Sequence, residues 1–553
     1  MGKWDAVTSA SAKHPKPEAQ NYTYGTAGFR TKYNHPQSLS STYLTWCRAD
    51  LLDSVVFRVG LLAILRSKKL QGQVIGVMIT ASHNPAHDNG VKVVDPQGDM
   101  LEASWEAHAT ALANAGDDKA LTKVLDTIID KYKIDLGIEA NVIYARDTRP
   151  SSIPLAQSLA DGINSLGGQS TDFGLKTTPQ LHYLVRCVNT ENTPASYGEP
   201  SEHGYYLKLA TAFRTLMKGK PKAEKIYIDC ANGVGAPKLR DFKKLVGDDL
   251  FDIEVINDDI EDPSKLNKDC GADYVKTQQS LPPGSDVPKG ARCASFDGDA
   301  DRLVYYYTDA GENGRFHLLD GDKIATLAAT FIKDLVEQAN IDIGVGVVQT
   351  AYANGSSTTF LTKTLGLPVT CTPTGVKYLH HAAQRYDIGV YFEANGHGTV
   401  LFSPATVELL IKHEAQSPAQ QSALSRLRAL SDLINQTVGD ALSDLLLVEA
   451  ILAHKGWSGS EWNSCYKDLP NRLVRAVVQD QTIYKTTDAE RRLVAPAGVQ
   501  EQIDQLCAKY KEARAFVRPS GTEPCVRVYC EARERSEMDH IALTIASWLE
   551  KDS

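Results

Sequence analysis

The sequence predicts an α/β fold spread over several domains. Short runs rich in β-branched residues end directly in loops of Gly, Pro, Ser and Asp, such as QVIGVMIT before ASHNP and CASF before DGDADR. Between them lie segments such as ALTKVLDTIIDKY, whose apolar residues recur at the spacing of an amphipathic helix. At 553 residues the chain is too long for one hydrophobic core. Alternating strands and helices form layered sheets, which bind ligands at loops beyond the strand ends.

Polar, turn-rich stretches suggest three domain boundaries, at 189–204, 308–316 and 454–462. The predicted domains are 1–195, 196–312, 313–450 and 451–553. In the last of them, the strand-like runs RAFVRPS and CVRVYCEAR precede a helix with Ile541, Ile545 and Leu549 on one face. We therefore expect a small α+β domain at the C-terminal end.

The composition argues against several classes of protein. A net charge of -9 disfavours a nucleic-acid partner, because binding a phosphate backbone needs a positive surface. No run of 18 apolar residues exists for a membrane span, and the first twenty residues lack the apolar core of a signal peptide. The ten cysteines form no CxxC pair and no Cys/His cluster. We expect reduced thiols in the cytoplasm rather than a zinc site or disulfides.

The loop ITASHNPAHDNGVKV contains a serine suited to phosphoryl transfer. Ser82 stands in a tight turn directly after a strand, with His83 next to it and Lys92 a short way along. A neighbouring imidazole and ammonium can move protons and neutralise phosphate oxygens. The alternative is an ordinary turn of Ser, Asn and Pro, and this loop taken alone favours the alternative.

The loop FDGDADR predicts a metal site. Asp297, Asp299 and Asp301 fall at alternate positions between two strand-like runs. Carboxylates so close together repel one another unless a cation lies among them, and oxygen ligands suit magnesium. A calcium EF-hand is excluded, since Arg302 and Thr308 stand where it needs Gly and Glu. A solvated acidic turn is the remaining alternative.

Two further loops have side chains suited to a sugar phosphate. VRPSGTEPCVRV offers guanidinium groups, hydroxyls and accessible backbone amides, which suit a phosphate monoester. FEANGHGT offers Glu393 and Asn395, which can bind sugar hydroxyls, and His397 between two glycines. Taken alone, the first is equally compatible with a turn that has incidental arginines, and the second is more typical of a polar hairpin.

Taken together and in this order, the four loops resemble those of the α-D-phosphohexomutase superfamily. TASHNP, DGDADR, EANGHG and RPSGTEP match its serine, metal, sugar and phosphate loops, and the resemblance runs from YGTAGFR over nearly the whole chain. EANGHG and NPAHDNGVKVVDPQGDML are most similar to the eukaryotic phosphoacetylglucosamine mutases. The resemblance implies four domains around a central cleft, three of mixed α/β type with a shared topology and a smaller α+β domain.

The resemblance also implies an isomerase that interconverts N-acetylglucosamine 6-phosphate and N-acetylglucosamine 1-phosphate and so supplies UDP-N-acetylglucosamine synthesis. Ser82 would be phosphorylated and would transfer its phosphoryl group through a sugar 1,6-bisphosphate. Mg²⁺ would be held by Ser82 and the three aspartates of DGDADR. Arg30 and Lys92 would flank the phosphoryl group, and His83 or His397 would move protons.

Substrate contacts are implied in the same way. Glu393 and Asn395 would recognise hydroxyls, and Thr374 and Gly375 of TPTGVKY are weaker candidates near the sugar. The residues expected to hold the distal phosphate are Arg518, Ser520, Gly521, Thr522 and Arg527.

Three alternative functions stay open at this point. The first is a sister mutase that acts on glucose or mannose phosphates, since it would differ only in the sugar loop. The second is a silent homologue that binds sugar phosphates. The third, a metal-dependent phosphatase, would leave the serine and phosphate loops without a purpose. The sequence does not determine the oligomeric state.

Overall fold

The structure is a computed structural model, and it describes residues 2–18, 20–25, 28–32, 48–222, 224–247, 249–311, 314–520 and 525–551. The chain forms two compact units. The first contains the described residues up to Leu318 together with Asp432–His454. The second contains Leu319–Ser431 and the described chain from Lys455 onward. This division does not test the four predicted domain ranges, which stay a prediction.

The serine loop follows the first strand of a mixed four-stranded sheet in the first unit. Its strands are β3 Ile75–Ile79, β4 Val91–Val94, β5 Asn141–Arg146 and β6 Gln169–Leu175. The order is β4-β3-β5-β6, with β4 antiparallel at one edge and the others parallel. Every residue of β3 is buried, as expected for a strand covered on both faces.

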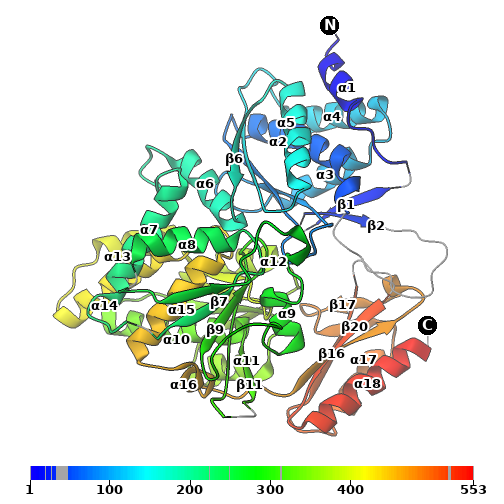
Figure 1. Ribbon diagram of the computed structural model, residues 1–553. Coiled ribbons are helices and arrows are strands. Elements are labelled where there is room, and N and C mark those ends of the chain that lie inside the picture. The colour runs from blue at the N-terminus through cyan, green and yellow to red at the C-terminus, as the bar shows by residue number, and fades with distance from the viewer. Residues whose placement is uncertain are drawn as a thin grey trace. The chain divides into compact units, whose positions relative to one another are not determined.

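Helices cover this sheet, and two of them, α2 and α5, pack side by side (Figure 1). The helices of this part are α2 Asp53–Lys69, α3 Ala103–Asn114, α4 Asp118–Tyr132, α5 Ser152–Ser165 and α6 Thr178–Thr190. The chain before them contains α1 Asp5–Ser11, the hairpin strands β1 Asn21–Gly25 and β2 Gly28–Lys32, and the short helix η1 Ala49–Leu51.

The metal loop connects two strands of a second sheet in the first unit. Its strands are β7 Ile226–Asp229, β8 Ile253–Ile256, β9 Arg292–Phe296, β10 Leu303–Thr308 and β11 Phe316–Leu319, in the order β11-β10-β9-β7-β8. β7, β8 and β9 are parallel, and β10 is antiparallel to β9. The neighbouring helices are α7 Glu202–Met217, α8 Gly235–Val246, α9 Gly271–Gln278 and α15 Ala441–Lys455. The α15 segment is tied to β9 by the buried ion pair of Glu449 with Arg292, 3.1 Å.

The second unit contains a third mixed sheet. Its strands are β12 Val345–Thr350, β13 Val369–Thr372, β14 Ile388–Phe392 and β15 Gly398–Phe402, in the order β13-β12-β14-β15 with β15 antiparallel. Its helices are α10 Gly321–Ala339, α11 Gly355–Thr359, α12 Val376–Ala383, α13 Pro404–Lys412 and α14 Pro418–Leu433, with a π-helical turn at Phe360–Thr364. All three sheets combine three parallel strands with an adjacent antiparallel strand, in agreement with the expected shared topology.

The C-terminal part contains an antiparallel sheet that shares a hydrophobic core with two helices. The sheet strands are β16 Asn471–Val477, β19 Arg514–Pro519 and β20 Cys525–Glu531, in the order β16-β20-β19, beside the hairpin β17 Lys485–Thr487 and β18 Arg492–Ala495. The helices are α16 Gly459–Asn463, α17 Val499–Cys507 and α18 Arg535–Lys551. Ile541, Ile545 and Leu549 of α18 are buried in one core with Val517 and Val528. The predicted α+β ending is therefore confirmed.

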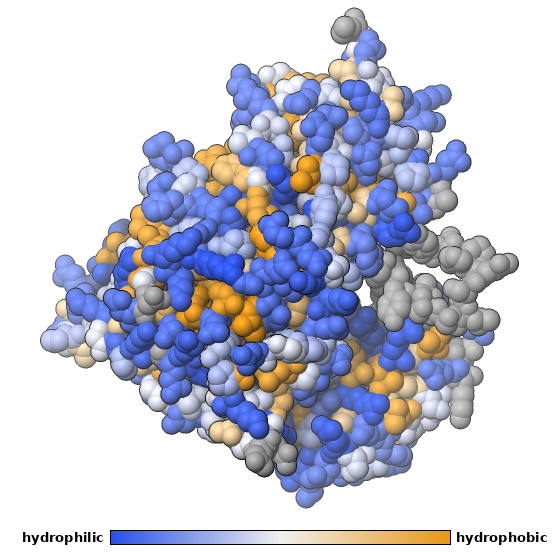
Figure 2. All heavy atoms as spheres, viewed as in Figure 1, coloured by the Kyte–Doolittle hydropathy of each residue, from blue (hydrophilic) through white to orange (hydrophobic). Residues whose placement is uncertain are grey.

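The predicted α/β class is confirmed, and the strands predicted from QVIGVMIT, KIYIDC, CASF and DIGVYFEA are present as β3, β7, β9 and β14. Every cysteine that the structure describes is a free thiol. Within the described residues, no helix is both long and apolar enough to span a membrane. Hydrophilic side chains cover most of the face drawn in Figure 2, with smaller hydrophobic patches between them.

Candidate active site

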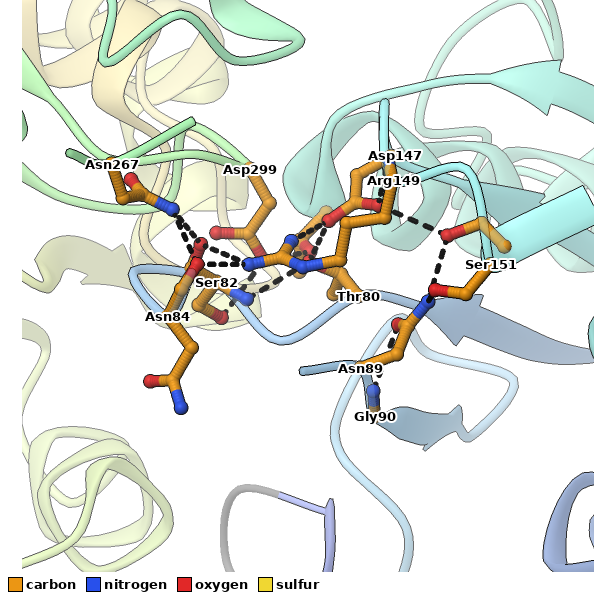
Figure 3. Close-up of polar contacts among 12 residues, drawn as sticks. Thr80, Ser82, Asn84, Asn89, Gly90, Asp147, Arg149, Ser151, Asn267 and Asp299 are labelled. Atoms are coloured by element: carbon orange, nitrogen blue, oxygen red, sulfur yellow. Dashed lines mark hydrogen bonds and ion pairs between the residues drawn. The ribbon is translucent and has the colours of Figure 1, made fainter. Parts of the chain in front are cut away.

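Ser82 follows β3 in a turn that holds its backbone in a left-handed conformation, with φ of +49°. Such a conformation is uncommon for any residue other than glycine. The Ser82 hydroxyl is buried and donates to Asp299 Oδ2 at 3.0 Å, and the Ser82 N–H donates to Thr80 Oγ1 at 3.0 Å (Figure 3). The turn therefore points the serine oxygen at the metal loop, which lies in the next sheet of the same unit.

Lys92 brings a positive charge to the same oxygen. It lies on β4 beside β3, and its Nζ donates to Ser82 Oγ at 3.0 Å and to Asp299 Oδ2 at 3.3 Å. Burial lowers the pKa of Lys92, but the charges of Asp299 and Asp301 outweigh this effect and raise the pKa above its usual value. The ammonium thus stays protonated at neutral pH, where it can neutralise charge on a phosphoserine oxygen.

The three aspartates of DGDADR converge as the sequence predicts. Asp297, Asp299 and Asp301 are buried, and one oxygen from each lies within 4.8 Å of the others. Asp297 Oδ1 accepts the backbone N–H of Asp301 at 3.1 Å, which fixes the loop. Asp299 Oδ2 also accepts from the Thr178 hydroxyl at 2.6 Å. Local hydrogen bonds thus preorganise a cluster of carboxylates.

This cluster fits a hard divalent cation. Asp297 Oδ2 and Asp299 Oδ1 are buried and accept no hydrogen bond from the described residues. Buried oxygens without partners are costly. Burial and the charges of Asp301 and Asp299 also raise the pKa of Asp297 well above its usual value. A cation would offset both effects, and an all-oxygen donor set suits Mg²⁺.

His83 next to the serine is half-buried and neutral at physiological pH. Burial and the nearby Arg302 charge lower its pKa to about 4. Its Nδ1 is buried and has no hydrogen-bond partner among the described residues. A neutral imidazole of this kind can accept a proton. Within the described part of the chain, no hydrogen bond joins His83 to the Ser82 hydroxyl.

Two residues that sequence reasoning missed donate hydrogen bonds to the backbone of the serine turn. Arg149 Nη2 donates to the carbonyl oxygens of Ser82 at 3.2 Å and of Asn84 at 2.6 Å. Asn267 Nδ2 donates to the same two oxygens at 2.9 Å each. Arg149 also forms a buried ion pair with Asp147, whose Oδ2 accepts from the Thr80 hydroxyl at 2.7 Å (Figure 3). The left-handed turn is therefore held from both sides.

The sequence contained one signal for the contact of Arg149 with the serine turn, the polar segment ARDTRPSS. This segment follows β5, and β5 runs parallel to β3, so the carboxyl ends of the two strands meet at one edge of the sheet. The polar residues after β3 and those after β5 could therefore have been predicted to lie close together. Asn267 lies in a loop before α9 with φ of +56°, and no motif marks it.

Several predicted residues fall outside what the structure describes. Gly521 and Thr522 are not among the described residues. Arg30 lies in β2 opposite Thr23, but its side chain is outside the described part. The roles assigned to these three residues stay predictions.

The sugar loop connects β14 to β15 in the second unit. The Glu393 N–H donates to His397 O at 2.8 Å, which closes the turn, and Gly396 supports it with φ of +90°. Asn395 Oδ1 accepts the His397 N–H at 3.0 Å. Glu393 and Asn395 are half-buried, whereas the His397 side chain is buried. The segment is therefore a hairpin loop, and its role in sugar binding stays a prediction.

Two of the predicted phosphate-binding arginines are neighbours across the C-terminal sheet. Arg518 on β19 stands directly opposite Arg527 on β20, and Arg527 stands opposite Arg475 on β16. Side chains of directly opposite residues share a face of the sheet, and like charges there repel. A bound anion would offset that repulsion. Ser520 is buried at the end of β19, where its N–H donates to Cys525 O at 3.0 Å.

Arg518 and Thr374 meet at a carboxylate that was not predicted. Glu490 Oε1 accepts from Arg518 Nε at 2.8 Å, and Glu490 Oε2 accepts from the Thr374 N–H at 2.9 Å and hydroxyl at 2.7 Å. Gly375 follows with φ of +130° at the start of α12. The structure thus joins two predicted substrate-binding loops of the second unit.

Family models match the chain in four regions. Models described as "Phosphoacetylglucosamine mutase AMG1", domains III and II, match residues 320–457 and 200–304. The model "Phosphoglucomutase/phosphomannomutase, C-terminal domain" matches residues 473–547, and the model of alpha/beta/alpha domain I from the same group matches 63–120 and 111–198.

Whole proteins agree with these matches. The human phosphoacetylglucosamine mutase is 51% identical over 543 residues, which cover 97% of this chain and 95% of that protein. Phosphoacetylglucosamine mutase 2 of Schizosaccharomyces pombe is 49% identical and covers 98% of this chain, with 97% of its own length matched.

Solved structures show the same similarity. An Aspergillus fumigatus N-acetylphosphoglucosamine mutase is 52% identical, with a TM-score of 0.94 and coverage of 100% of this chain and 99% of that one. Its complex with GlcNAc-6P and magnesium is 53% identical, with a TM-score of 0.92 and coverage of 99% and 98%. A further structure is a variant of that enzyme with glucose 1,6-bisphosphate, at 52% identity, a TM-score of 0.92 and coverage of 100% and 99%. This chain therefore belongs to the phosphoacetylglucosamine mutase family.

Proposed function

We propose that this chain interconverts N-acetylglucosamine 6-phosphate and N-acetylglucosamine 1-phosphate through a phosphorylated Ser82, and so supplies UDP-N-acetylglucosamine synthesis. The observation that supports this most is the buried Ser82 hydroxyl, whose oxygen lies 3.0 Å from both Lys92 Nζ and Asp299 Oδ2. A serine between an ammonium and a carboxylate cluster suits reversible phosphoryl transfer. The ligands of the related Aspergillus fumigatus structures support the substrate and the bisphosphate intermediate.

In the first transfer the bond from Ser82 Oγ to phosphorus breaks while a free sugar hydroxyl oxygen bonds to phosphorus. Lys92 neutralises the charge that develops on Ser82 Oγ. A histidine, His83 or His397, accepts the proton of the hydroxyl. Asp297, Asp299 and Asp301 would hold Mg²⁺, which would supply Lewis-acid polarisation of the phosphoryl oxygens. The 1,6-bisphosphate then turns end for end and returns its other phosphate to Ser82.

In this proposal the phosphate loop and the sugar loop orient the substrate. Arg518, Ser520 and Arg527, together with Gly521 and Thr522, hold the phosphate that is not reacting. Glu393 and Asn395 bind hydroxyls in both orientations of the sugar. Thr374 and Gly375 lie near the sugar. Positioning and charge neutralisation are the main contributions a protein makes to phosphoryl transfer.

A coupled assay tests the proposal. N-acetylglucosamine 6-phosphate, glucose 6-phosphate and mannose 6-phosphate are supplied separately, with Mg²⁺ and a trace of the matching 1,6-bisphosphate. We expect the acetylated sugar to give the highest kcat/KM and purified protein to carry phosphate on Ser82. A preference for glucose or mannose would assign the chain to a sister activity, and release of free phosphate would indicate a phosphatase.

We further infer that the reaction takes place in the cytoplasm. The free thiols of all described cysteines support this location, because reducing compartments keep thiols unpaired. Fluorescence microscopy of the tagged chain tests it, and an organellar or secreted signal would contradict it.

A further inference from the structure

The tip of the β17–β18 hairpin has an unusual backbone. Asp488, Ala489 and Glu490 have φ values of +52°, +53° and +68°. Three consecutive non-glycine residues in the left-handed region are rare and unfavourable. Arg491 closes the tip, because its N–H and its Nε both donate to Asp488 O at 3.1 Å. Backbone strain of this kind persists where the surroundings determine it, and it concentrates at functional sites.

The strained tip presents one carboxylate to two loops. Both oxygens of Glu490 are used, Oε1 by Arg518 and Oε2 by the N–H and hydroxyl of Thr374. Glu490 and Arg518 are only 18% and 25% exposed, so this ion pair is more shielded from water than an ordinary surface pair. The contact with Arg518 occupies only Nε, and a guanidinium has four further N–H donors on its two terminal nitrogens.

We infer that Glu490 is a positioning residue, which fixes the phosphate-binding Arg518 and the sugar-side loop at Thr374 relative to each other. This inference rests on the function proposed above. Holding Nε fixes the plane of the guanidinium, so that its terminal nitrogens meet a phosphate in one orientation. Because the same carboxylate holds Thr374, the spacing between the two binding loops is set before the substrate arrives. Preorganisation of this kind lowers the entropic cost of binding.

A competing interpretation makes Glu490 an internal anion that the substrate phosphate displaces. The two interpretations predict opposite effects of removing its charge. A negative charge beside an anion site opposes phosphate binding, so its removal alone would tighten binding. Loss of positioning would weaken binding. Weaker binding after neutralisation is therefore a result that only the positioning role explains.

The test compares Glu490→Gln with the unaltered chain. We expect the KM for N-acetylglucosamine 6-phosphate to rise about tenfold while kcat falls less than about threefold. Calorimetric titration with inorganic phosphate should show a similar rise in Kd, and this second readout does not need turnover. A KM and a phosphate Kd that are unchanged or lower would overturn the inference.

Two further variants separate positioning from general damage. Glu512→Gln removes an exposed Glu–Arg ion pair of the same unit, from Glu512 Oε2 to Arg533 Nε at 2.9 Å. It should leave KM and the phosphate Kd unchanged. The double variant Glu490→Gln/Arg518→Gln should bind phosphate no more weakly than Arg518→Gln alone, because both act through one guanidinium. Additive losses would contradict the inference. An unaltered chain that binds phosphate but converts no sugar phosphate would refute the proposed function alone.

Discussion

At the scale of single residues, the left-handed turn at Ser82 is the feature on which the proposed chemistry depends. Its φ of +49° directs the hydroxyl at Asp299 and Lys92 instead of away from them. A conformation of this kind needs support from its surroundings. Arg149 and Asn267 provide that support by binding the carbonyl oxygen of Ser82 itself.

Ser82→Ala should abolish turnover, with kcat reduced by at least about 10³-fold, because it removes the hydroxyl that is proposed to carry the phosphate. The thermal midpoint should change little, since only one hydroxyl is removed. The coupled assay measures turnover, and differential scanning calorimetry measures the thermal midpoint. Normal turnover by this variant would exclude a phosphoserine intermediate.

Arg149→Met should destabilise the first unit by about 3–5 kcal/mol, because it leaves the Asp147 carboxylate buried without its partner. It should also lower kcat, since the serine turn loses one of its two supports. Arg146→Gln is the matched control, at the last residue of β5, three residues before Arg149. It removes a partly exposed ion pair with Asp172 and should cost no more than about 1 kcal/mol. Denaturant unfolding compares the free energies of unfolding of the two variants. Equal losses of stability would show that the buried ion pair has no special role.

At the scale of secondary-structure elements, the close contact of α2 with α5 holds the first sheet's covering layer together. The two helices approach each other closely at Gly60 and Gly162. A Cβ atom at Gly162 would lie on the Phe57 carbonyl oxygen of α2, and a Cβ at Gly60 would approach the Leu159 carbonyl oxygen of α5. The absence of side chains is therefore what allows this helix pair to pack.

Gly162→Ala should destabilise the chain by about 1–3 kcal/mol or more, because the added methyl group forces the helices apart. Gly116→Ala is the control, since a Cβ there meets nothing within 4 Å. Differential scanning calorimetry should show a lower unfolding temperature only for the first variant. Equal midpoints would mean that α2 and α5 can separate without cost.

A second prediction at this scale concerns the arginines that lie side by side on β16, β20 and β19. Arg475 shares a sheet face with Arg527 and Arg518, so it adds positive charge to the proposed phosphate site. Arg475→Gln should raise the KM for the sugar phosphate about two- to fivefold with little change in kcat, and the effect should shrink at high salt. Arg472→Gln is the control, since Arg472 lies on the same strand and forms an ion pair with Asp539. Identical KM values would remove Arg475 from the phosphate site.

At the scale of the whole molecule, the metal loop couples ligand binding to stability. The three buried aspartates are unfavourable together without a cation, whereas a bound cation favours only the folded state. The loop joins β9 to β10 in the centre of the second sheet. Magnesium binding should therefore stabilise the first unit as a whole.

Mg²⁺ at about 100 times its Kd should stabilise the chain by about 2.7 kcal/mol, and EDTA should remove both this gain and the activity. Asp299→Asn should lose the magnesium-dependent shift in Tm. A thermal-shift titration measures it. A shift of the same size in the variant would place the cation elsewhere.

The sequence by itself determined the α/β class, the strands before each loop, the C-terminal α+β part and the convergence of the three aspartates. These follow from hydrophobic periodicity and from charge repulsion between residues that are close in the chain. The sequence also predicted that Lys92 lies near Ser82, because both belong to one short segment. The resemblance of four loops in fixed order then pointed to the family that the comparisons show.

Only the tertiary structure decided which distant residues support those loops. Asn267 reaches the Ser82 turn from the loop before α9, and Glu490 joins Arg518 to Thr374 across more than a hundred residues. Neither residue lies in a motif, because a hydrogen bond to a carbonyl oxygen or to a guanidinium can be made by many side chains. Their roles arise from strand order and backbone conformation. Packing sets both, and local sequence patterns do not encode them.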